Sequence, residues 1–434
     1  METAELSISK YDTKEYKRSR GAYAMECAFE YFVTLLVGDA FLVKILQNIG
    51  MSDALIGICS SFVTLAFLFQ LITVFVAHKI CNTKRVVFIS HIISHLFFML
   101  LYAIPFLPIE SELKQVFYVI FVFVAYFGSY FVSSILYKWG NSYVDPTKRA
   151  SYSATKEMIS LATGIAMTLI IGYIVDIYDA AGDIYGSFIF CAIAILIFAI
   201  SELVCVMLIK NDIKPKEDRE KLNFREVMQS SFGNKNFRSV IFLTVIWDVA
   251  RYSVLGFLGT YRLTELAFTV GAVQVINFLG SGARFLISKP FGKFSDKHSF
   301  ARGIELALLI AVVGFGINVF TTPATRYLIV VQVVAYNMCL AGTNQNLTNI
   351  TYNYVDAKYF AQASAIKNSI GGVCGFVSAL LAGKLLSYIQ ENGNTFLGIE
   401  VYGQQVLSLI ACVLFLIALI FTHFVIAKQK RMVQ

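Results

Sequence analysis

The chain has 434 residues, of which 57% are hydrophobic and only 15% are charged, and its formal net charge is +8. Soluble domains carry about 25% charged residues, so this composition excludes a soluble enzyme, a disordered chain and a disulfide scaffold. A membrane-spanning helix needs roughly 20 apolar residues, and about twelve such helices would account for the apolar half of the chain.

Apolar runs along the chain predict twelve membrane-spanning helices. The first twenty residues are polar, and the run after them carries Glu26, Glu30 and Asp39 without a small-residue cleavage pattern. This run is therefore a first span and not a removable signal peptide. The predicted spans are 22–46, 54–78, 86–107, 115–137, 158–178, 187–209, 239–261, 270–290, 303–321, 327–349, 363–388 and 403–427. We therefore predict an all-α integral membrane protein.

Basic residues fall unevenly on the two sides of these spans. If the N-terminus is placed inside, the inside segments hold about 29 of the 36 Lys and Arg residues, and the outside loops hold only Lys114, Arg262 and Arg326. Excess Lys and Arg marks cytoplasmic loops, so both termini are predicted to be cytoplasmic in a multi-pass protein of the cell membrane. The basic residues are dispersed between apolar runs, so we expect no nucleic acid partner.

One long charged segment divides the chain in the middle. It runs from Lys210 to Arg238, whereas most loops in compact folds are much shorter. We predict an N-terminal six-helix bundle over 1–209, a cytoplasmic linker over 210–238 and a C-terminal six-helix bundle over 239–434. The apolar residues of a short amphipathic helix within the linker would be Leu222, Phe224, Val227 and Met228.

A motif is repeated between the fourth and fifth spans of each half. Tyr143-Val144-Asp145 in the first half is matched by Tyr354-Val355-Asp356 in the second. The same offset also pairs Ala150 with Ala361, Ser153-Ala154 with Ser364-Ala365, Lys156 with Lys367, and Gly164 with Gly375. This spacing predicts a parallel internal repeat, and hence two bundles related by pseudo-two-fold symmetry.

A third motif lies between the eighth and ninth spans. Residues 292–297 read Gly-Lys-Phe-Ser-Asp-Lys and are followed by Arg302. Together with the twelve spans, the central linker and the repeat, this loop resembles the signature of the major facilitator superfamily of secondary transporters. The equivalent loop between the second and third spans keeps only Lys84 and Arg85.

The resemblance implies alternating access, in which two bundles rock around a central site. It also implies that spans 1, 4, 7 and 10 line the cavity, that spans 3, 6, 9 and 12 face lipid, and that Asp296 takes part in gating. The expected partners are a small-molecule substrate, a proton or other coupling ion, and membrane lipid. We expect a monomer that has no cofactor and is not an enzyme.

Charged residues inside the spans are the first candidates for function, because a charge in the bilayer centre is costly unless it faces a cavity or a partner. Glu26 and Glu30 lie four residues apart and share one helix face. Two such carboxylates repel, so they are candidates for proton coupling. Alternatively, Glu26 lies at the membrane interface and Glu30 pairs with a basic residue. Asp39 and Lys44 are expected to form an outer pair.

The seventh and eighth spans supply the basic partners. Asp248 and Arg251 lie three apart beside Trp247 and can form an ion pair within one helix, or Arg251 can instead meet substrate or Glu30. Arg284 in the eighth span is a second candidate partner for the carboxylates of the first span.

Amides and tyrosines supply candidate substrate contacts. The tenth span is rich in amides, which both donate and accept hydrogen bonds and suit hydroxyl-rich ligands, although they could also join neighbouring helices. The fourth span offers two tyrosines four residues apart. The predicted substrate-binding residues are Asn337, Asn344, Gln345, Tyr126, Tyr130 and Trp247.

Metal and nucleotide chemistry find little support in the sequence. His91 and His95 lie four apart in the third span, but no carboxylate near them in the sequence completes a metal site. We therefore predict no metal. The phosphate-loop and hydrolase motifs are also missing.

These features predict a proton symporter for a small polar solute, with a sugar or polyol favoured. The alternatives are a proton-coupled exporter of drugs or amphiphiles, and a solute sensor or lipid scramblase on the same fold. The exporter is disfavoured because the fifth span carries Gly164 and Gly172 but no proline.

Overall fold

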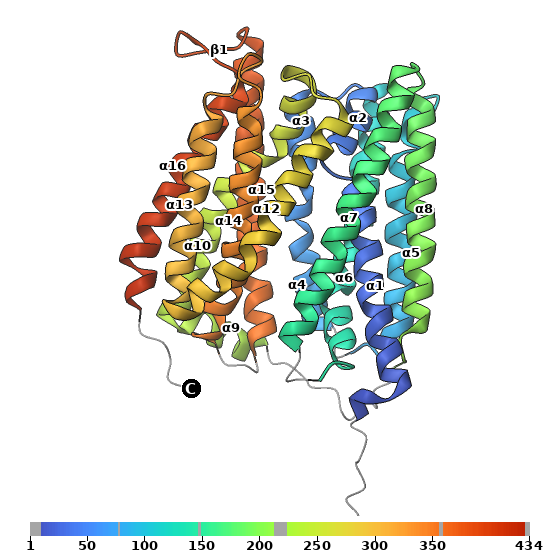
Figure 1. Cartoon of the computed structure of the whole chain (residues 1–434), viewed down its shortest axis with the longest axis vertical. Coiled ribbons are helices and arrows are strands. Elements are labelled where there is room, and N and C mark those ends of the chain that lie inside the picture. Colours follow the sequence, from blue (N-terminus) through green and yellow to red (C-terminus); the bar gives the residue numbers. More distant parts are fainter. Residues whose placement is uncertain (1–9, 77–78, 146–148, 212–223, 356–358, 430–434) are drawn as a thin grey trace, which may run out of the picture.

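A computed structural model describes residues 10–76, 79–145, 149–211, 224–355 and 359–429. Nearly all of this part of the chain is helical, and the helices form two bundles that stand side by side (Figure 1). We call the end where α1 (Lys14–Leu36) begins and α16 (Gly403–Phe424) ends the terminus end, and the opposite end the far end. The predicted all-α, twelve-span fold in two six-helix bundles is confirmed.

Each bundle is built from six spans, several of which are made of more than one helix. The remaining helices of the first bundle are α2 (Asp39–Asn48), α3 (Asp53–Ser60), α4 (Ala66–Val76), α5 (Thr83–Leu101), α6 (Ser111–Asn141), α7 (Arg149–Ala180) and α8 (Ile184–Leu208). Those of the second are α10 (Lys235–Tyr252), α11 (Leu258–Thr260), α12 (Val270–Lys297), α13 (Phe300–Asn318), α14 (Leu328–Tyr352) and α15 (Phe360–Glu391).

Within the described residues, ten helices are long and apolar enough to cross a membrane. The two other spans fall short for different reasons. The first, α1, is 23 residues long but carries Arg20, Glu26 and Glu30, and α14 carries amide side chains that lower its hydropathy. Both still cross the bundle with their neighbours (Figure 1), so the count of twelve holds.

Three predicted spans are broken near the far end, which the apolar pattern did not reveal. The first breaks at Val37 and Gly38, and Asp39 there has φ of 47°, a left-handed conformation that costs a non-glycine residue energy. The second is divided by a 3-10 turn at Phe62–Thr64. The seventh continues past α10 as η7 (Leu255–Phe257), α11 and the π-helical turn η8 (Tyr261–Glu265). Hydropathy does not register such breaks, because it averages over a window and the broken spans 53–73 and 235–265 remain apolar on average.

The bundles contact one another mainly through α7 with α12, α4 with α15, and α3 with α15 and η7. Glycines allow the closest approach. A Cβ atom on Gly256 would lie 2.4 Å from the carbonyl oxygen of Gly57, and one on Gly57 would overlap the Phe257 ring. Only glycine fits this crossing at the far end.

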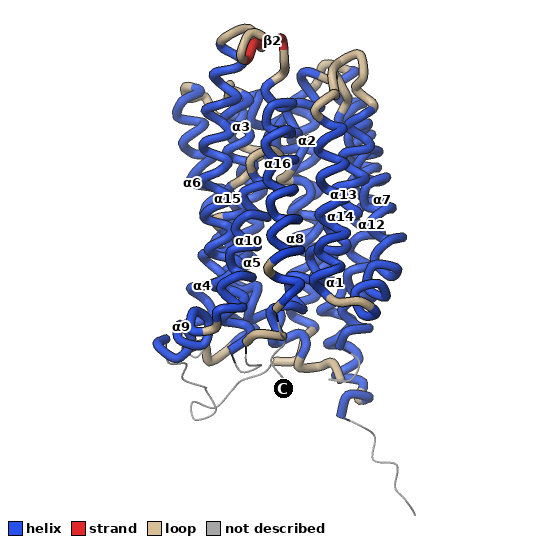
Figure 2. The backbone as a smooth tube through the Cα atoms, turned by 90° about the vertical axis from the view of Figure 1, so that its left-hand side faces the viewer, coloured by secondary structure: helices blue, strands red, loops and turns tan. Residues whose placement is uncertain are grey.

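The lipid-facing surface agrees with the helical period. On α5 the exposed apolar side chains include Ile89, Ile92, Ile93 and Leu96, whereas His91 and His95 are buried on the other side of the same helix. The small antiparallel pair β1 (Thr395–Phe396) and β2 (Ile399–Glu400) caps the far end between α15 and α16 (Figure 2).

The predicted linker is described only in part. Residues 212–223, and with them Leu222, lie outside the described residues. The remaining apolar positions of the predicted amphipathic helix fall on α9 (Phe224–Gly233), which lies at the terminus end (Figure 1). The linker boundaries at 210 and 238 stay a prediction.

Candidate functional site

The two carboxylates of α1 lie in different surroundings. Glu30 is half-buried and accepts a hydrogen bond from the Ser129 hydroxyl of α6. Glu26 is fully buried, and its Oε2 accepts a hydrogen bond from the thiol of Cys27 at 3.3 Å. Glu26 is therefore enclosed by protein, and its depth in the membrane, which the alternative placed at the interface, stays a prediction. The partner of Glu30 is a hydroxyl and not the basic side chain that the alternative required.

The histidines of α5 are completed by a carboxylate from α8. Glu202 contacts His91 Nδ1 through one oxygen and His95 Nε2 through the other, and all three side chains are at most 3% exposed. On the opposite side of the imidazole, His91 Nε2 lies 3.9 Å from Glu26 Oε1. The expectation that no carboxylate completes the histidine pair is wrong, because α8 brings one from more than 100 residues away. A lone Glu in the otherwise apolar run 187–209 was the signal that could have revealed it.

In the second bundle, the predicted ion pair of α10 is present. The Arg251 guanidinium donates to Asp248 Oδ1 through Nε at 2.8 Å and lies 2.7 Å from it through NH2. The same group stacks over the Tyr252 ring at 4.4 Å and over the Trp247 ring at 5.5 Å. Trp247 is only 3% exposed and stacks on Tyr336, so it packs inside the second bundle.

A buried lysine of α15 lies beside this pair. Lys367 donates to the Leu347 carbonyl at 3.0 Å and to the Thr351 hydroxyl at 3.3 Å, and it also interacts electrostatically with Asp248. Its counterpart in the repeat, Lys156, donates to the Tyr23 hydroxyl at 3.1 Å. Sequence comparison of the halves identified both lysines as a repeated pair but gave them no role.

The tyrosines of α6 connect the two bundles. Tyr130 lies within electrostatic range of Glu30 in the first bundle and of Arg251 in the second. Tyr126 packs edge-on against Tyr130, with ring centroids 6.0 Å apart, and both side chains are half-buried. The structure thus brings Tyr126, Tyr130, Glu30 and Arg251 to the same central region.

The amides of α14 do not share one environment. Asn337 Nδ2 donates to the Val333 carbonyl of its own helix at 2.9 Å. Asn346 donates to Ser295 of α12 at 2.9 Å, which is the inter-helix bond that the alternative describes. Asn344 is exposed, and the side chain of Gln345 lies outside the described part of the chain.

Arg284 and Asp296 lie apart from the carboxylates of α1. Arg284 donates to Glu157 of α7 at 3.0 Å and so joins the two bundles, which corrects the expectation that it pairs with Glu26 or Glu30. Asp296 is exposed near the terminus end of α12.

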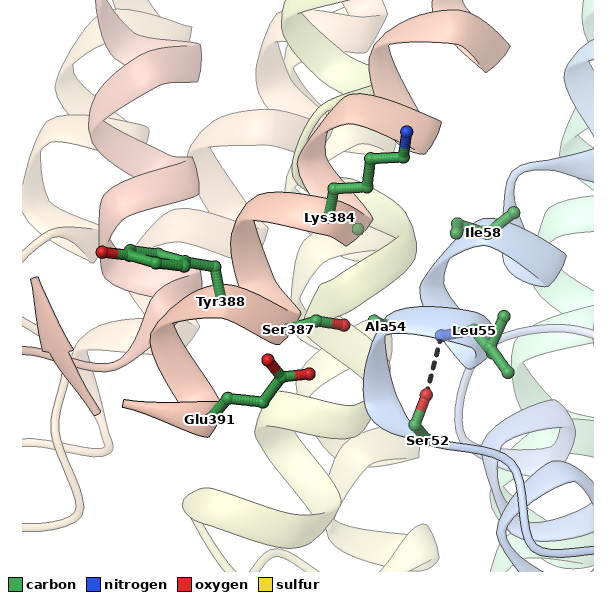
Figure 3. Close-up of a pocket in the computed structure, with 9 residues that line it drawn as sticks. Ser52, Ala54, Leu55, Ile58, Lys384, Ser387, Tyr388 and Glu391 are labelled. Carbon is green, nitrogen blue, oxygen red and sulfur yellow. Dashed lines mark hydrogen bonds between the residues drawn. The ribbon is translucent and has the colours of Figure 1, made fainter. Parts of the chain in front are cut away.

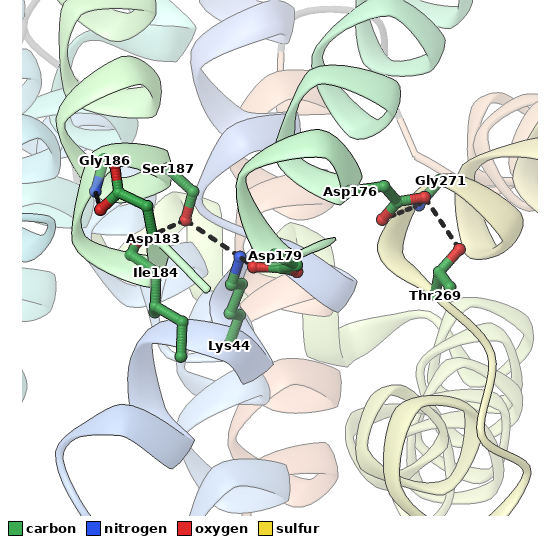
Figure 4. Close-up of polar contacts among 9 residues, drawn as sticks. All are labelled: Lys44, Asp176, Asp179, Asp183, Ile184, Gly186, Ser187, Thr269 and Gly271. Atoms are coloured by element: carbon green, nitrogen blue, oxygen red, sulfur yellow. Dashed lines mark hydrogen bonds and ion pairs between the residues drawn. The ribbon is translucent and has the colours of Figure 1, made fainter. Parts of the chain in front are cut away.

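A second correction concerns Asp39 at the far end. It pairs with Arg262 of the other bundle at 2.6 Å and accepts a bond from Asn277 at 2.7 Å. Lys44 instead pairs with Asp179 and donates to Ser187, both in its own bundle (Figure 4). The break before α2 turns the two side chains in different directions, which spacing along one continuous helix could not anticipate.

Further polar contacts join the bundles at the far end. Asp176 of α7 accepts hydrogen bonds from the Thr269 hydroxyl at 2.8 Å and from the Gly271 amide at the start of α12 (Figure 4). Gln390 of α15 donates to Asp53 of α3 at 3.1 Å. Polar contacts therefore hold the two bundles together at the far end.

A pocket of about 350 Å³ opens beside these contacts, between α3 and α15. Its polar lining comes from Ser52 on one side and from Lys384, Ser387 and Glu391 on the other (Figure 3). It lies at the far end and does not include the residues around Arg251.

Two bundles of six spans, with charged side chains inside and a polar fastening across their interface, define a polytopic membrane transporter. A family model described as Major Facilitator Superfamily matches residues 28–379. The chain belongs to this superfamily, as the loop motif and repeat predicted, and it is a transporter of that type.

Solved structures agree with this assignment. The nucleoside transporter NupG superposes with a TM-score of 0.67 at 12% identity, covering 96% of this chain and 100% of that chain. An auto-inhibited POT family peptide transporter gives 0.70 at 12% identity, with 97% and 98% covered. A variant of the E. coli fucose:proton symporter FucP gives 0.57 at 12% identity, with 97% and 100% covered. At these identities the similarity shows the fold alone. A comparison with curated protein sequences finds no match.

Proposed function

We propose that the protein is a proton symporter for a small polar solute, with a sugar or polyol favoured, that works by alternating access. The observation that supports this most is that Tyr130 interacts electrostatically with both Glu30 of one bundle and Arg251 of the other. A solute bound here would touch both bundles at once. Its binding could therefore favour one arrangement of the bundles over another, as alternating access requires.

The chemistry of the central residues supports a hydroxyl-rich solute. Tyr126 and Tyr130 offer aromatic faces and hydroxyl groups, and Arg251 offers guanidinium donors that can bind hydroxyl oxygens. Asn344, an exposed amide of α14, stays a predicted contact. The fold is shared with a fucose:proton symporter, which is compatible with this class of solute. Asn337, Gln345 and Trp247 remain predicted contacts.

In this proposal Glu30 carries the coupling proton. It is half-buried next to Ser129, and it lies on a helix that the family resemblance places at the cavity. When it is charged, Glu30 accepts a hydrogen bond from the hydroxyl of Ser129. Protonation would weaken this interaction and allow the bundles to rearrange. Glu26 is the second predicted coupling residue, and its full burial makes exchange of a proton with water slower than at Glu30.

The experiment is uptake into proteoliposomes with an imposed pH gradient, beside counterflow without one. A thermal-shift screen against sugars, polyols, nucleosides, amino acids and cationic drugs first identifies the solute. Glu30→Gln should keep counterflow and lose accumulation driven by the pH gradient. Glu112→Gln, at an exposed position of α6, is the matched control and should behave like wild type. Accumulation by Glu30→Gln at the wild-type level would refute the proposal.

The orientation in the cell membrane is part of the same proposal. The terminus end is cytoplasmic, as the distribution of Lys and Arg indicates. The native Cys81 is exposed between α4 and α5 at this end. An impermeant thiol reagent should leave Cys81 unlabelled in intact cells, and it should label a cysteine introduced at Glu112 at the far end. Labelling of Cys81 from outside would reverse the orientation.

A further inference from the structure

The buried cluster of His91, His95, Glu202 and Glu26 adjoins Glu30, because carboxylate oxygens of Glu26, Glu30 and Glu202 lie within 4.8 Å of one another. It is formed by α5, α8 and α1 inside the first bundle. One ligand atom each from His91, His95 and Glu202 lies within 4.8 Å of the others. These side chains are separated from lipid by the apolar outer faces of α5 and α8.

The contacts within this cluster leave part of it unsatisfied. Glu202 pairs with His91 Nδ1 and His95 Nε2. Among the described residues, His91 Nε2, His95 Nδ1 and Glu26 Oε1 are buried without a hydrogen-bond partner. Buried polar atoms are normally paired, so three unpaired atoms around one carboxylate require an explanation. Their positions also have a direction, because one nitrogen of each histidine converges on the carboxylate of Glu202.

We propose that His91, His95 and Glu202 bind a divalent first-row transition metal ion. Two imidazoles and one carboxylate are a ligand set that such ions prefer, and alkaline-earth ions favour sets made of oxygen. His91 would bind through Nδ1 and His95 through Nε2, the nitrogens that face Glu202. The fourth position is open to a further ligand, as in zinc sites with three protein ligands.

Glu26 fits the role of a supporting group in this site. Metal-binding histidines almost always donate their second N–H to a carboxylate or carbonyl, which fixes the ring and its tautomer. The second nitrogen of His91, Nε2, lies 3.9 Å from Glu26 Oε1. Glu26 is therefore a positioning residue that acts through His91.

The charges also balance. With Glu26 and Glu202 ionised and both imidazoles neutral, the cluster carries two negative charges in a fully buried position, which is costly, and the half-buried Glu30 lies within 4.8 Å of them. One divalent ion neutralises them and joins α5 to α8. Such an ion would stabilise the first bundle against thermal unfolding, independently of which solute the protein carries and of whether Glu30 couples protons.

The test is metal loading of the full-length protein, purified in detergent without a histidine tag and stripped with EDTA. One equivalent of Co²⁺ should give the visible d–d absorption of a low-coordinate site with nitrogen ligands and should raise the melting temperature. Mg²⁺ should do neither. If Co²⁺ produces no spectrum and no thermal shift in the wild-type protein, the proposal is wrong and the cluster is neutralised by protons.

Variants assign the ion to these side chains. Glu202→Gln and His95→Gln should lose the spectrum. Glu26→Gln should keep it and bind Co²⁺ about 10- to 100-fold more weakly, as loss of a supporting carboxylate does. His298→Gln, at an exposed histidine of the other bundle, is the control and should match wild type. A spectrum that survives in Glu202→Gln and disappears in His298→Gln would place the ion elsewhere. Uptake measurements are not involved, so failure of the symport proposal would leave this result unchanged.

Discussion

The two bundles hold their buried charges in different ways. In the second bundle, Asp248 lies against Arg251 and within the field of Lys367, so acid and base compensate each other inside the protein. In the first bundle, Glu26 and Glu202 meet imidazoles. An imidazole can be neutral or protonated, so the charge of that bundle depends on protons or on a bound cation. Buried charge must be compensated, so the two bundles differ in whether the compensating charge is fixed by side chains or can change.

The repeat makes this difference more informative. Lys156 and Lys367 occupy equivalent positions, yet Lys156 is half-buried against Tyr23 and Lys367 is fully enclosed against α14. The repeated lysine thus has different surroundings in the two halves. The two bundles share an architecture, and their polar interiors differ.

The largest effect is expected when the ion pair of the second bundle is broken, which tests whether its buried acid and base compensate each other. Arg251→Met leaves Asp248 buried with only Lys367 nearby, and we expect the free energy of unfolding to fall by about 3–5 kcal/mol. The measurement is the melting temperature in detergent. Arg302→Met removes a pair whose arginine is 51% exposed, and it should cost at most about 1 kcal/mol. If Arg251→Met melts like wild type, the stability of the second bundle does not depend on the ion pair between Asp248 and Arg251.

The next test concerns the polar contacts that hold the two bundles together at the far end. Arg262→Gln removes a charged contact to Asp39, so the closed far end should lose about 1–3 kcal/mol. A cysteine at Val43, which is 1% exposed and packs near Gly259 of the other bundle, reports opening through thiol labelling quantified by peptide mass spectrometry.

Labelling of this cysteine should become about 5- to 150-fold faster in Arg262→Gln if it follows the population of the open state. The matched control is Lys44→Gln, which breaks a pair inside the first bundle and should leave the rate unchanged. Equal acceleration by both variants would mean that local loosening, and not separation of the bundles, exposes residue 43.

The smallest expected effect compares the two repeated lysines. Lys367→Met leaves buried acceptors unpaired and should cost about 1–3 kcal/mol. Lys156→Met loses a half-buried contact with the Tyr23 ring, which should cost about 0.5–1 kcal/mol. Thermal unfolding of the two variants side by side measures the difference. Equal losses would show that the lysines are equivalent in energy as well as in position.

The sequence by itself determined the number of spans, the repeat and the superfamily. Hydropathy and repeated spacing can be read from short stretches of sequence. A long apolar segment in lipid must satisfy its own backbone hydrogen bonds, so it forms a spanning helix. The same local reasoning identified Glu30, Arg251, Tyr126 and Tyr130 as polar groups that a membrane helix cannot leave facing lipid, and the fold places them in one central region.

Only the tertiary structure decided which of these groups meet. Local spacing paired Asp39 with Lys44, but the helix breaks before α2, and Asp39 instead forms an ion pair with Arg262. Spacing likewise left His91 and His95 without a carboxylate, but packing of α8 against α5 supplies Glu202. Helix period fixes which face a residue occupies, whereas its partner depends on which helix packs against that face and at what height. Contacts between distant segments set that choice, and no local pattern encodes it.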